Sequence, residues 1–257
     1  MKKTLLTALT ALAVSFGAAT TGSAAIIGTT GTGTVNWLAG YGPVGGHGAE
    51  YTWTVTSAPT SFLDKLCYIT GPEGTSMLRP RITDFNFQTF CLERREDAGS
   101  GDFVLNSVVF AGGVGAPATG DPLSLGASWL YSRFARGLLA GYDYTPGAGR
   151  LSTAGQLQNA IWALEGDRAI PAPGTNQFYD LAVAQFGASA ASDAPVGENG
   201  VFVMNVSTTD AQGVVTRKQD FLVHLCVPES GSTLIVLGLS LCGLSLFRAR
   251  VARKTVA

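Results

Sequence analysis

The sequence predicts an α+β fold, in which an antiparallel β-sheet or sandwich carries a three-helix segment inserted between its strands. Two patterns predict it. Strand-like segments fill the first and last parts of the chain, whereas helical spacing of apolar residues dominates the middle. No parallel βαβ repeat is visible. Strands first, helices next and strands last therefore indicate α+β in one domain.

Length, composition and charge narrow the functions that the chain can have. It has 257 residues, 33 of them glycine, only 14% are charged, and the formal net charge is -1 at pH 7. This length gives room for one sizeable domain, or two small ones, together with terminal signals. Nucleic-acid binding needs a basic face. We therefore expect no nucleic-acid partner.

The first 24 residues predict a secretory signal peptide. Met1-Lys2-Lys3 gives a basic start, an apolar run extends from Leu5 to Phe16, and Gly22-Ser23-Ala24 provides a small-x-small cleavage site. The alternative is a buried N-terminal helix, which this order of features disfavours. We expect the remaining domain, residues 25–226, to lie outside the cytoplasm.

The last residues predict a membrane-spanning helix. The run from Ser232 to Phe247 is nearly free of polar groups, although it is slightly shorter than the usual ~20 residues. Four basic residues follow it at once: Arg248, Arg250, Arg253 and Lys254. Basic residues stay on the cytoplasmic side of a membrane, so the domain is expected on the outer side, at the cell envelope or cell surface.

A short motif precedes this apolar run and consists of Val227, Pro228, Glu229, Ser230 and Gly231. The motif, helix and basic tail together resemble the C-terminal sorting signals called PEP-CTERM, in the variant Val-Pro-Asp-Ser-Gly, with Glu229 in place of the Asp. The resemblance implies an exosortase-type membrane peptidase as a partner, which trims the tail and passes the protein to the cell surface. A plain single-pass anchor is the alternative.

Strands are predicted in two groups. Before the helices they cover Gly33–Leu38, Glu50–Val55, Pro80–Glu93 and Asp102–Phe110. After the helices, Val201–Val206 and Asp220–Leu225 flank a turn region at Asp210–Gly213 and are expected to pair as a hairpin. Bulky and hydroxyl-bearing residues alternate in several of these segments, which is typical of half-buried strands. We expect the neighbouring strands to form an antiparallel sheet.

Three helices are predicted between these groups, and the central one is the most informative. The first covers Leu130–Leu138 and the third covers Asn176–Phe186. The central helix is expected to begin at Ser152 or Thr153, whose hydroxyl can cap the first turn, and to stop at Gly166. Its core-facing stripe, at spacings i, i+3, i+4 and i+7, is Leu157, Ala160, Ile161 and Leu164.

Two motifs resemble the paired signature of the Cys-Gln thioester domains of bacterial surface proteins. They are Phe90-Cys91-Leu92-Glu93, in a predicted strand, and Leu157-Gln158-Asn159-Ala160-Ile161-Trp162, in the central helix. In that family a strand Cys and a helix Gln are joined by an intramolecular thioester, so the resemblance implies a bond between Cys91 and Gln158. The family often has Thr directly before the Gln, and Leu157 departs from that pattern.

The thioester that this resemblance implies can form only if the fold positions the two groups and keeps water from them. The Cys91 thiolate must attack the Gln158 carboxamide and expel ammonia, and holding both groups on rigid elements makes that step unimolecular. Phe90 and Trp162 are candidates to keep water from the bond. Glu93 and Glu165 are candidate bases by position alone. An extracellular amine or hydroxyl would then be acylated by Gln158, once and without turnover, so an enzyme is not expected.

The cysteine count leaves more than one arrangement open. Cys67, Cys91 and Cys226 lie before the apolar C-terminal run, and Cys242 lies within it. If Cys91 is committed to Gln158, Cys67 and Cys226 remain as a natural disulfide pair. If instead Cys67 is bonded to Cys91, Cys226 is left over beside the sorting motif. The first arrangement accounts for more of the cysteines.

Two other functions remain open. A cysteine hydrolase would use Cys91 as nucleophile with His47 or His224 as base, although no hydrolase signature surrounds the cysteine. A non-reactive structural protein of the envelope or biofilm matrix would be held by disulfides, with Gln158 only hydrogen-bonded. No cluster of Cys and His has metal-ligand spacing, and no phosphate-binding loop is visible. We therefore expect neither a metal nor another cofactor.

Overall fold

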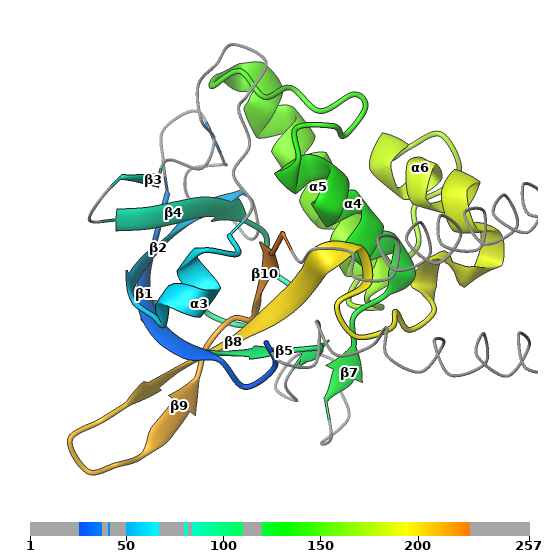
Figure 1. Cartoon of the computed structure of the whole chain (residues 1–257). Coiled ribbons are helices and arrows are strands. Elements are labelled where there is room, and N and C mark those ends of the chain that lie inside the picture. Colours follow the sequence, from blue (N-terminus) through cyan, green and yellow to red (C-terminus); the bar gives the residue numbers. More distant parts are fainter. Residues whose placement is uncertain are drawn as a thin grey trace, which may run out of the picture. The chain divides into compact units, whose positions relative to one another are not determined.

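Most of the described strands form one curved antiparallel sheet (Figure 1). The structure, a computed structural model, describes residues 26–37, 41, 50–66, 80–81, 84–109 and 120–226. The predicted signal peptide, the sorting motif from Val227 to Gly231 and the apolar C-terminal segment lie outside these residues. Within them, no helix has the length and the apolar composition needed to cross a membrane.

The main sheet is built from strands of both predicted groups. These are β1 (Thr30–Asn36), β2 (Tyr51–Ser57), β3 (Pro80–Arg81), β4 (Asp84–Thr89), β5 (Gly101–Asn106), β8 (Val201–Thr209), β9 (Val215–Arg217) and β10 (Phe221–His224). The order is β10-β8-β5-β1-β2-β4-β3, with β9 also paired to β8. Every pairing of these strands is antiparallel. The predicted α+β class with an antiparallel sheet is confirmed.

The sheet closes on itself at the residues that follow β4. Cys91 forms an antiparallel bridge with Phe221 of β10. Leu92 N donates to Asp220 O at 3.1 Å, and Leu222 N donates to Phe90 O at 3.4 Å. β10, the first strand in this order, therefore meets the segment that continues β4, and Figure 1 shows β10 beside the curve that β1, β2 and β4 make.

The inside of this curve is an aromatic core. Trp53 of β2 packs edge-on against Phe103 of β5, with ring centroids 6.2 Å apart, and tilted against Phe221 at 5.5 Å. Phe62, from the short helix α3 (Thr60–Leu63), adds a ring 5.5 Å from Phe103. Gly33 of β1 lets the Trp53 ring approach, since a Cβ at that position would lie 2.4 Å from its Nε1.

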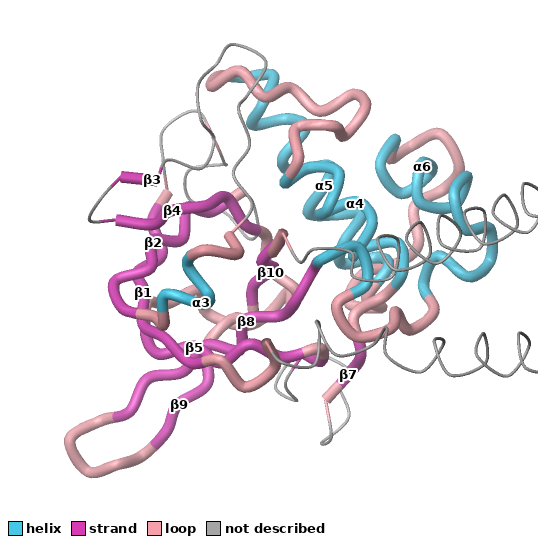
Figure 2. Tube along the Cα trace, viewed as in Figure 1, coloured by secondary structure: helices cyan, strands magenta, loops and turns pink. Residues whose placement is uncertain are grey.

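The helices cover the sheet from one side and form a second core with it. They are α4 (Leu125–Ala135), α5 (Ala148–Leu164) and α6 (Gln177–Phe186), and they lie between β7 (Asp121–Pro122) and β8 in the sequence. Figure 2 shows them gathered on one side of the strands. The buried residues at this contact include Phe90, Leu222, Leu130, Phe134, Leu157, Ile161 and Phe178. Short 3₁₀ turns at Gly187–Ala191 and Glu198–Gly200 connect α6 to β8.

Several predicted helix boundaries are wrong. The central helix begins at Ala148, before the expected start at Ser152 or Thr153, with Gly147 as its N-cap at φ 149°. The Thr153 hydroxyl donates to backbone oxygens of the preceding turn instead of capping. The first helix begins and ends earlier than predicted, and Leu138 lies beyond its end and is exposed. In contrast, Gly166 follows the C-cap of α5 at φ 83°.

Two predicted strands also differ from the structure. The segment 80–93 contains two strands, β3 and β4, which pair with each other in antiparallel orientation. The segment 102–110 is split at Ser107 into β5 and β6 (Val108–Val109), where Ser107 N bonds to the Asn106 side chain at 2.8 Å. Local side-chain bonds of this kind compete with strand pairing, which is a common effect of asparagine.

The last predicted hairpin has the expected pairing, but its returning strand is divided into two strands. Val201–Met204 of β8 pairs with β10, as expected. The returning strand first forms β9 against Ser207–Thr209, and Lys218 to Asp220 separate β9 from β10. In Figure 1, β9 and the end of β8 extend away from the rest of the sheet. The interruption places Gln219 and Asp220 beside the residues that follow Cys91.

Candidate functional site

Cys91 lies where the sheet closes, immediately beyond the end of β4. Phe90 and Leu92 belong to the core under the helices. Because side chains alternate along an extended strand, Cys91 points to the opposite face, inside the curve of the sheet. Cys91 is only 3% exposed, and its thiol is free. A cysteine in such a place is shielded from most reagents in solution.

Gln158 meets this cysteine from the helical side. It occupies the middle of α5 and is 1% exposed. Cys91 N donates to Gln158 Oε1 at 3.0 Å, and Gln158 Nε2 donates to Cys91 O at 2.7 Å. The carboxamide therefore binds Cys91 as a neighbouring strand would, with both of its polar ends satisfied. The structure thus brings together the two residues that the sequence motifs single out.

This contact has a chemical consequence for the carboxamide. The backbone N–H of Cys91 points at the oxygen that becomes negative when a nucleophile adds to the Gln158 carbonyl. A fixed donor aimed at such an oxygen stabilises the tetrahedral intermediate, as in an oxyanion hole. The partner bond to Cys91 O fixes the nitrogen that would leave. The electrophile is therefore polarised and oriented by the same residue that carries the thiol.

The thiol itself is not activated by its surroundings. Burial raises the pKa of the Cys91 thiol, and the nearby hydroxyl of Tyr51 lowers it by hydrogen bonding, while the charge of Glu93 would raise it further. The net effect keeps the thiol protonated at neutral pH. Sulfur reactions at this site therefore depend on positioning and local hydrogen bonding more than on a standing thiolate.

The two candidate bases are engaged elsewhere. Glu93 Oε2 accepts hydrogen bonds from Asp220 N at 3.2 Å and from Gln219 Nε2 at 3.4 Å. Burial and the charge of Asp220 raise the pKa of Glu93 to about 9, so it is protonated at neutral pH. Glu165 Oε1 accepts from the Ser124 hydroxyl and backbone N–H. Burial raises the pKa of Glu165 to about 7.

The two predicted shielding residues are both buried but occupy different places. Phe90 packs its ring edge-on against Phe134 of α4, with centroids 5.0 Å apart. Trp162 lies one helical turn beyond Gln158, and its Nε1 has no hydrogen-bond partner within the described part of the chain. Tyr51 and Phe221 lie beside Cys91 on its own face, and the sequence motifs did not indicate them.

A buried ion pair fixes the helix that carries Gln158. Arg150, in the first turn of α5, donates from Nε to Glu50 Oε2 at 2.8 Å and from Nη2 to Glu50 Oε1. Tyr142 also donates to Glu50, and Arg150 donates to Tyr144 O. Glu50 directly precedes Tyr51 at the start of β2. The ion pair therefore ties the strand on one side of Cys91 to the helix on its other side.

The other cysteines and the histidines bear on the alternatives. Cys226 is disulfide-bonded. Its N–H donates to Lys65 O at 2.7 Å, and Leu66 pairs with Leu225, so the chain just before Cys67 runs beside it. Cys67 and His47 lie outside the described residues. His224 Nε2 lies 3.2 Å from the Ser132 hydroxyl, and burial lowers its pKa to about 4.

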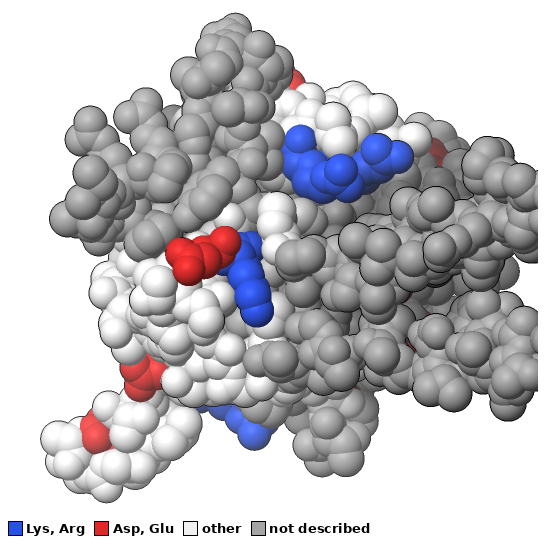
Figure 3. Space-filling model, viewed as in Figure 1, with Lys and Arg blue, Asp and Glu red and all other residues white. Residues whose placement is uncertain are grey.

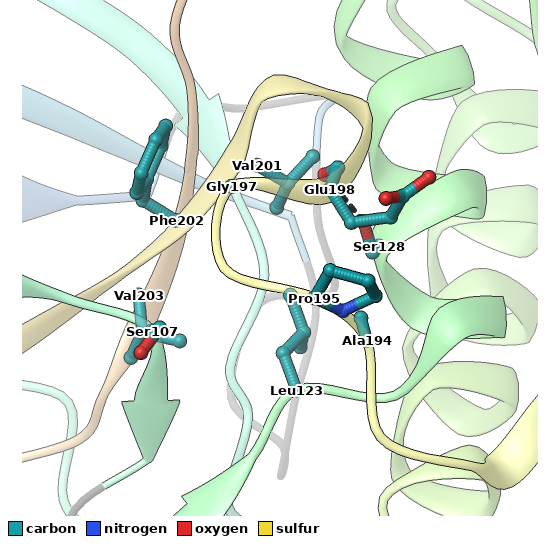
Figure 4. A pocket seen from close by; sticks show the side chains of 10 residues that line it. All are labelled: Ser107, Leu123, Ser128, Ala194, Pro195, Gly197, Glu198, Val201, Phe202 and Val203. Atoms are coloured by element: carbon teal, nitrogen blue, oxygen red, sulfur yellow. Dashed lines mark hydrogen bonds between the residues drawn. The ribbon is translucent and has the colours of Figure 1, made fainter. Parts of the chain in front are cut away.

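Two cavities in the described part of the chain lie away from Cys91 and Gln158. The cavity in Figure 4, between β8 and α4, has about 10 Å³, roughly the space of one water molecule. A larger cavity of about 440 Å³ lies at the end of α5 and is lined by Glu165, Arg168 and Asp193 among others. No group of three or more metal-ligating side chains is found among the described residues.

The described surface in Figure 3 shows no large patch of one charge. On the face in Figure 3, Lys, Arg, Asp and Glu residues occur in small separate groups, and most of the described surface there is uncharged. Comparison of the chain with protein-family models, with curated proteins and with solved structures found no match, so the thioester-domain resemblance rests on its two motifs.

Proposed function

We propose that the chain is an exported, surface-anchored protein in which Cys91 and Gln158 form an internal thioester for covalent attachment to an extracellular amine or hydroxyl. The observation that carries this proposal is the pair of hydrogen bonds between the Gln158 carboxamide and the backbone of Cys91. They hold an electrophilic carbon against the residue that bears a free, buried thiol.

The reaction needs no oxidant and no cofactor. In formation, the Cys91 sulfur bonds to the Gln158 carboxamide carbon, the carbon–nitrogen bond breaks, and the thiol proton leaves with the nitrogen as ammonia. In attachment, an amine or hydroxyl bonds to the same carbon, the carbon–sulfur bond breaks, and the proton of the nucleophile ends on the sulfur. Burial of both residues protects the thioester from water in the meantime.

The ends of the chain supply the setting for this chemistry. Residues 1–24 would direct export, residues 25–226 would form the thioester domain, and residues 227–257 would anchor it through a transmembrane helix until an exosortase-type peptidase acts at the motif from Val227 to Gly231. The target would be an amine or hydroxyl on a surface or matrix polymer. The protein would then act as an adhesin or in matrix attachment.

One observation favours a second function. Both polar atoms of Gln158 are satisfied by Cys91, which is also what a purely structural glutamine needs. The chain would then be a non-reactive structural protein of the envelope or biofilm matrix, held by the disulfide of Cys226. Intact mass distinguishes the two functions because only the thioester form has lost ammonia.

The test compares wild-type protein with Cys91→Ala and Gln158→Ala. We expect wild type to be lighter than its sequence by one ammonia beyond the disulfide hydrogens, and to gain one methylamine on incubation with it. Both variants should show neither change. Gln156→Ala, which replaces another glutamine of α5, is the matched control and should behave as wild type. Wild-type protein of full mass that ignores methylamine would contradict the thioester.

A further inference from the structure

Tyr51 approaches Cys91 across the sheet. It begins β2 and pairs with Thr89 of β4. Cys91 comes two residues after Thr89, so Tyr51 and Cys91 are diagonal neighbours on one face of the sheet. Side chains of aromatic length reach such diagonal neighbours. The two side chains therefore lie near each other, and the Tyr51 hydroxyl lowers the pKa of the Cys91 thiol.

Packing holds the Tyr51 ring in this position. The ring lies edge-on to Phe221, with centroids 5.7 Å apart, and Phe221 is the residue that bridges to Cys91. On its other side the ring lies 5.8 Å from that of Trp37. Tyr51 is buried. Its hydroxyl therefore lies near the sulfur, in a place from which most water is excluded and where a hydrogen bond to a charged atom is strengthened.

We propose that Tyr51 is a catalytic residue of the thioester cycle, whose hydroxyl donates a hydrogen bond to the Cys91 sulfur as that sulfur attacks and as it leaves. The proposal rests on the proposed function. In thioester formation, negative charge develops on the sulfur as the thiol loses its proton. In thioester opening, it develops on the sulfur before the proton of the incoming nucleophile reaches it. The hydroxyl stabilises that charge and keeps its own proton at the end.

The other groups near Cys91 are less suited to this role. Glu93 is bound to Gln219 and Asp220, and an ionised carboxylate beside the sulfur would oppose negative charge there. His224 contacts Ser132 on α4 instead. Burial raises the pKa of Tyr51, so its hydroxyl remains a donor throughout the neutral range. The Cys91 N–H donates to the Gln158 oxygen and is not a donor to the sulfur, so Tyr51 is the better candidate for that hydrogen bond.

The experiment replaces only the hydroxyl. Tyr51→Phe keeps the ring between Phe221 and Trp37, and Tyr131→Phe is its matched control, because Tyr131 is another buried tyrosine whose hydroxyl donates to Gln88 O near Cys91. The ammonia loss and the rate of methylamine addition are followed by intact mass, and folding by melting temperature. We expect Tyr51→Phe to slow methylamine addition about tenfold to a hundredfold, or to prevent the ammonia loss, and Tyr131→Phe to change neither.

The outcomes separate this inference from the proposed function. Wild-type protein without ammonia loss overturns both. A thioester in wild type that forms and opens equally fast in Tyr51→Phe overturns the role of Tyr51 alone. If Tyr51→Phe does not fold, replacement of Tyr51 by 3,5-difluorotyrosine keeps the ring and gives a stronger hydrogen-bond donor. That replacement should then open faster than wild type, and an unchanged rate overturns the inference.

Discussion

Two buried glutamates near Cys91 differ in whether a cation pairs with them. Glu50, just before Tyr51 on β2, faces the Arg150 guanidinium and the Tyr142 hydroxyl. Glu93, two residues after Cys91, faces Gln219 and Asp220 and has no basic partner among the described hydrogen bonds and ion pairs. Both side chains are almost completely removed from water. Only one of them has a cation that offsets the cost of burial.

The difference determines which carboxyl is charged. Burial raises the pKa of Glu50, but the hydrogen bonds and charge of Arg150 oppose this, so we infer an ion pair. For Glu93, burial and the charge of Asp220 both raise the pKa, to about 9. The ion pair can therefore fix α5 to β2, while a neutral Glu93 spares the Cys91 sulfur the repulsion of an adjacent anion. The charged Glu50 and Arg150 position α5, whereas the carboxyl closest in sequence to the Cys91 sulfur, that of Glu93, is neutral.

The largest expected effect comes from removing the cation. Arg150→Met leaves Glu50 buried without its partner, and breaking a buried pair in this way costs about 3–5 kcal/mol of the free energy of unfolding. Urea denaturation followed by circular dichroism measures the loss. Because Gln158 lies on the same helix as Arg150, we also expect a smaller fraction of the protein to lose ammonia.

The double variant Glu50→Gln with Arg150→Met is the control for this effect. It removes both charges, so it should regain a large part of the stability that Arg150→Met loses. A loss below about 1 kcal/mol in Arg150→Met would show that Glu50 tolerates burial alone. The contrast with Glu93 would then disappear.

Glu93→Gln is expected to act in the opposite direction. Its folded pKa of about 9 lies above the ordinary glutamate pKa of 4.5, so the free energy of unfolding decreases as the pH rises from about 4.5 to about 9. Glutamine keeps a carbonyl oxygen for Asp220 N and cannot ionise. We expect a gain of at least about 1 kcal/mol at pH 8, the value of one pKa unit, and none at pH 4.

Urea denaturation of wild type and Glu93→Gln at several pH values tests this dependence. The difference between the two proteins should widen steadily between pH 5 and pH 8. A constant difference over this range would mean that Glu93 is ionised in the folded protein at neutral pH. In that case both glutamates near Cys91 would be charged.

The sequence predicted elements whose signals are local. Asn176 caps α6 with its side chain, Gly166 ends α5, and the apolar stripe of α5 is buried. The start of α5 was missed because Arg150 resembles a solvent-exposed residue. It is buried only because it meets Glu50, a hundred residues earlier in the chain, and spacing along one segment cannot reveal such a partner.

The candidate site shows the same limit. Two motifs singled out Cys91 and Gln158, and the structure joins them by hydrogen bonds. Tyr51 was missed because its place beside Cys91 depends on the register between β2 and β4, which only pairing fixes. Glu93 and Glu165 lie near the motifs in sequence, but their contacts with Asp220 and Ser124 are long-range and could not be read from position.

The smallest expected effect concerns the second donor to Glu50. Tyr142→Phe removes one hydroxyl and keeps the ring against Phe134 and Phe178. Losing one hydrogen bond to a charged acceptor that keeps its main partner should cost about 1–2 kcal/mol. In an Arg150→Met background, Tyr142→Phe should lower the free energy of unfolding by more, because the Tyr142 hydroxyl is then a larger part of the hydrogen bonding that Glu50 retains. Equal costs in both backgrounds, measured by urea denaturation, would mean that Glu50 is already protonated beside Arg150. The two glutamates would then differ in their hydrogen bonds alone and not in their charge.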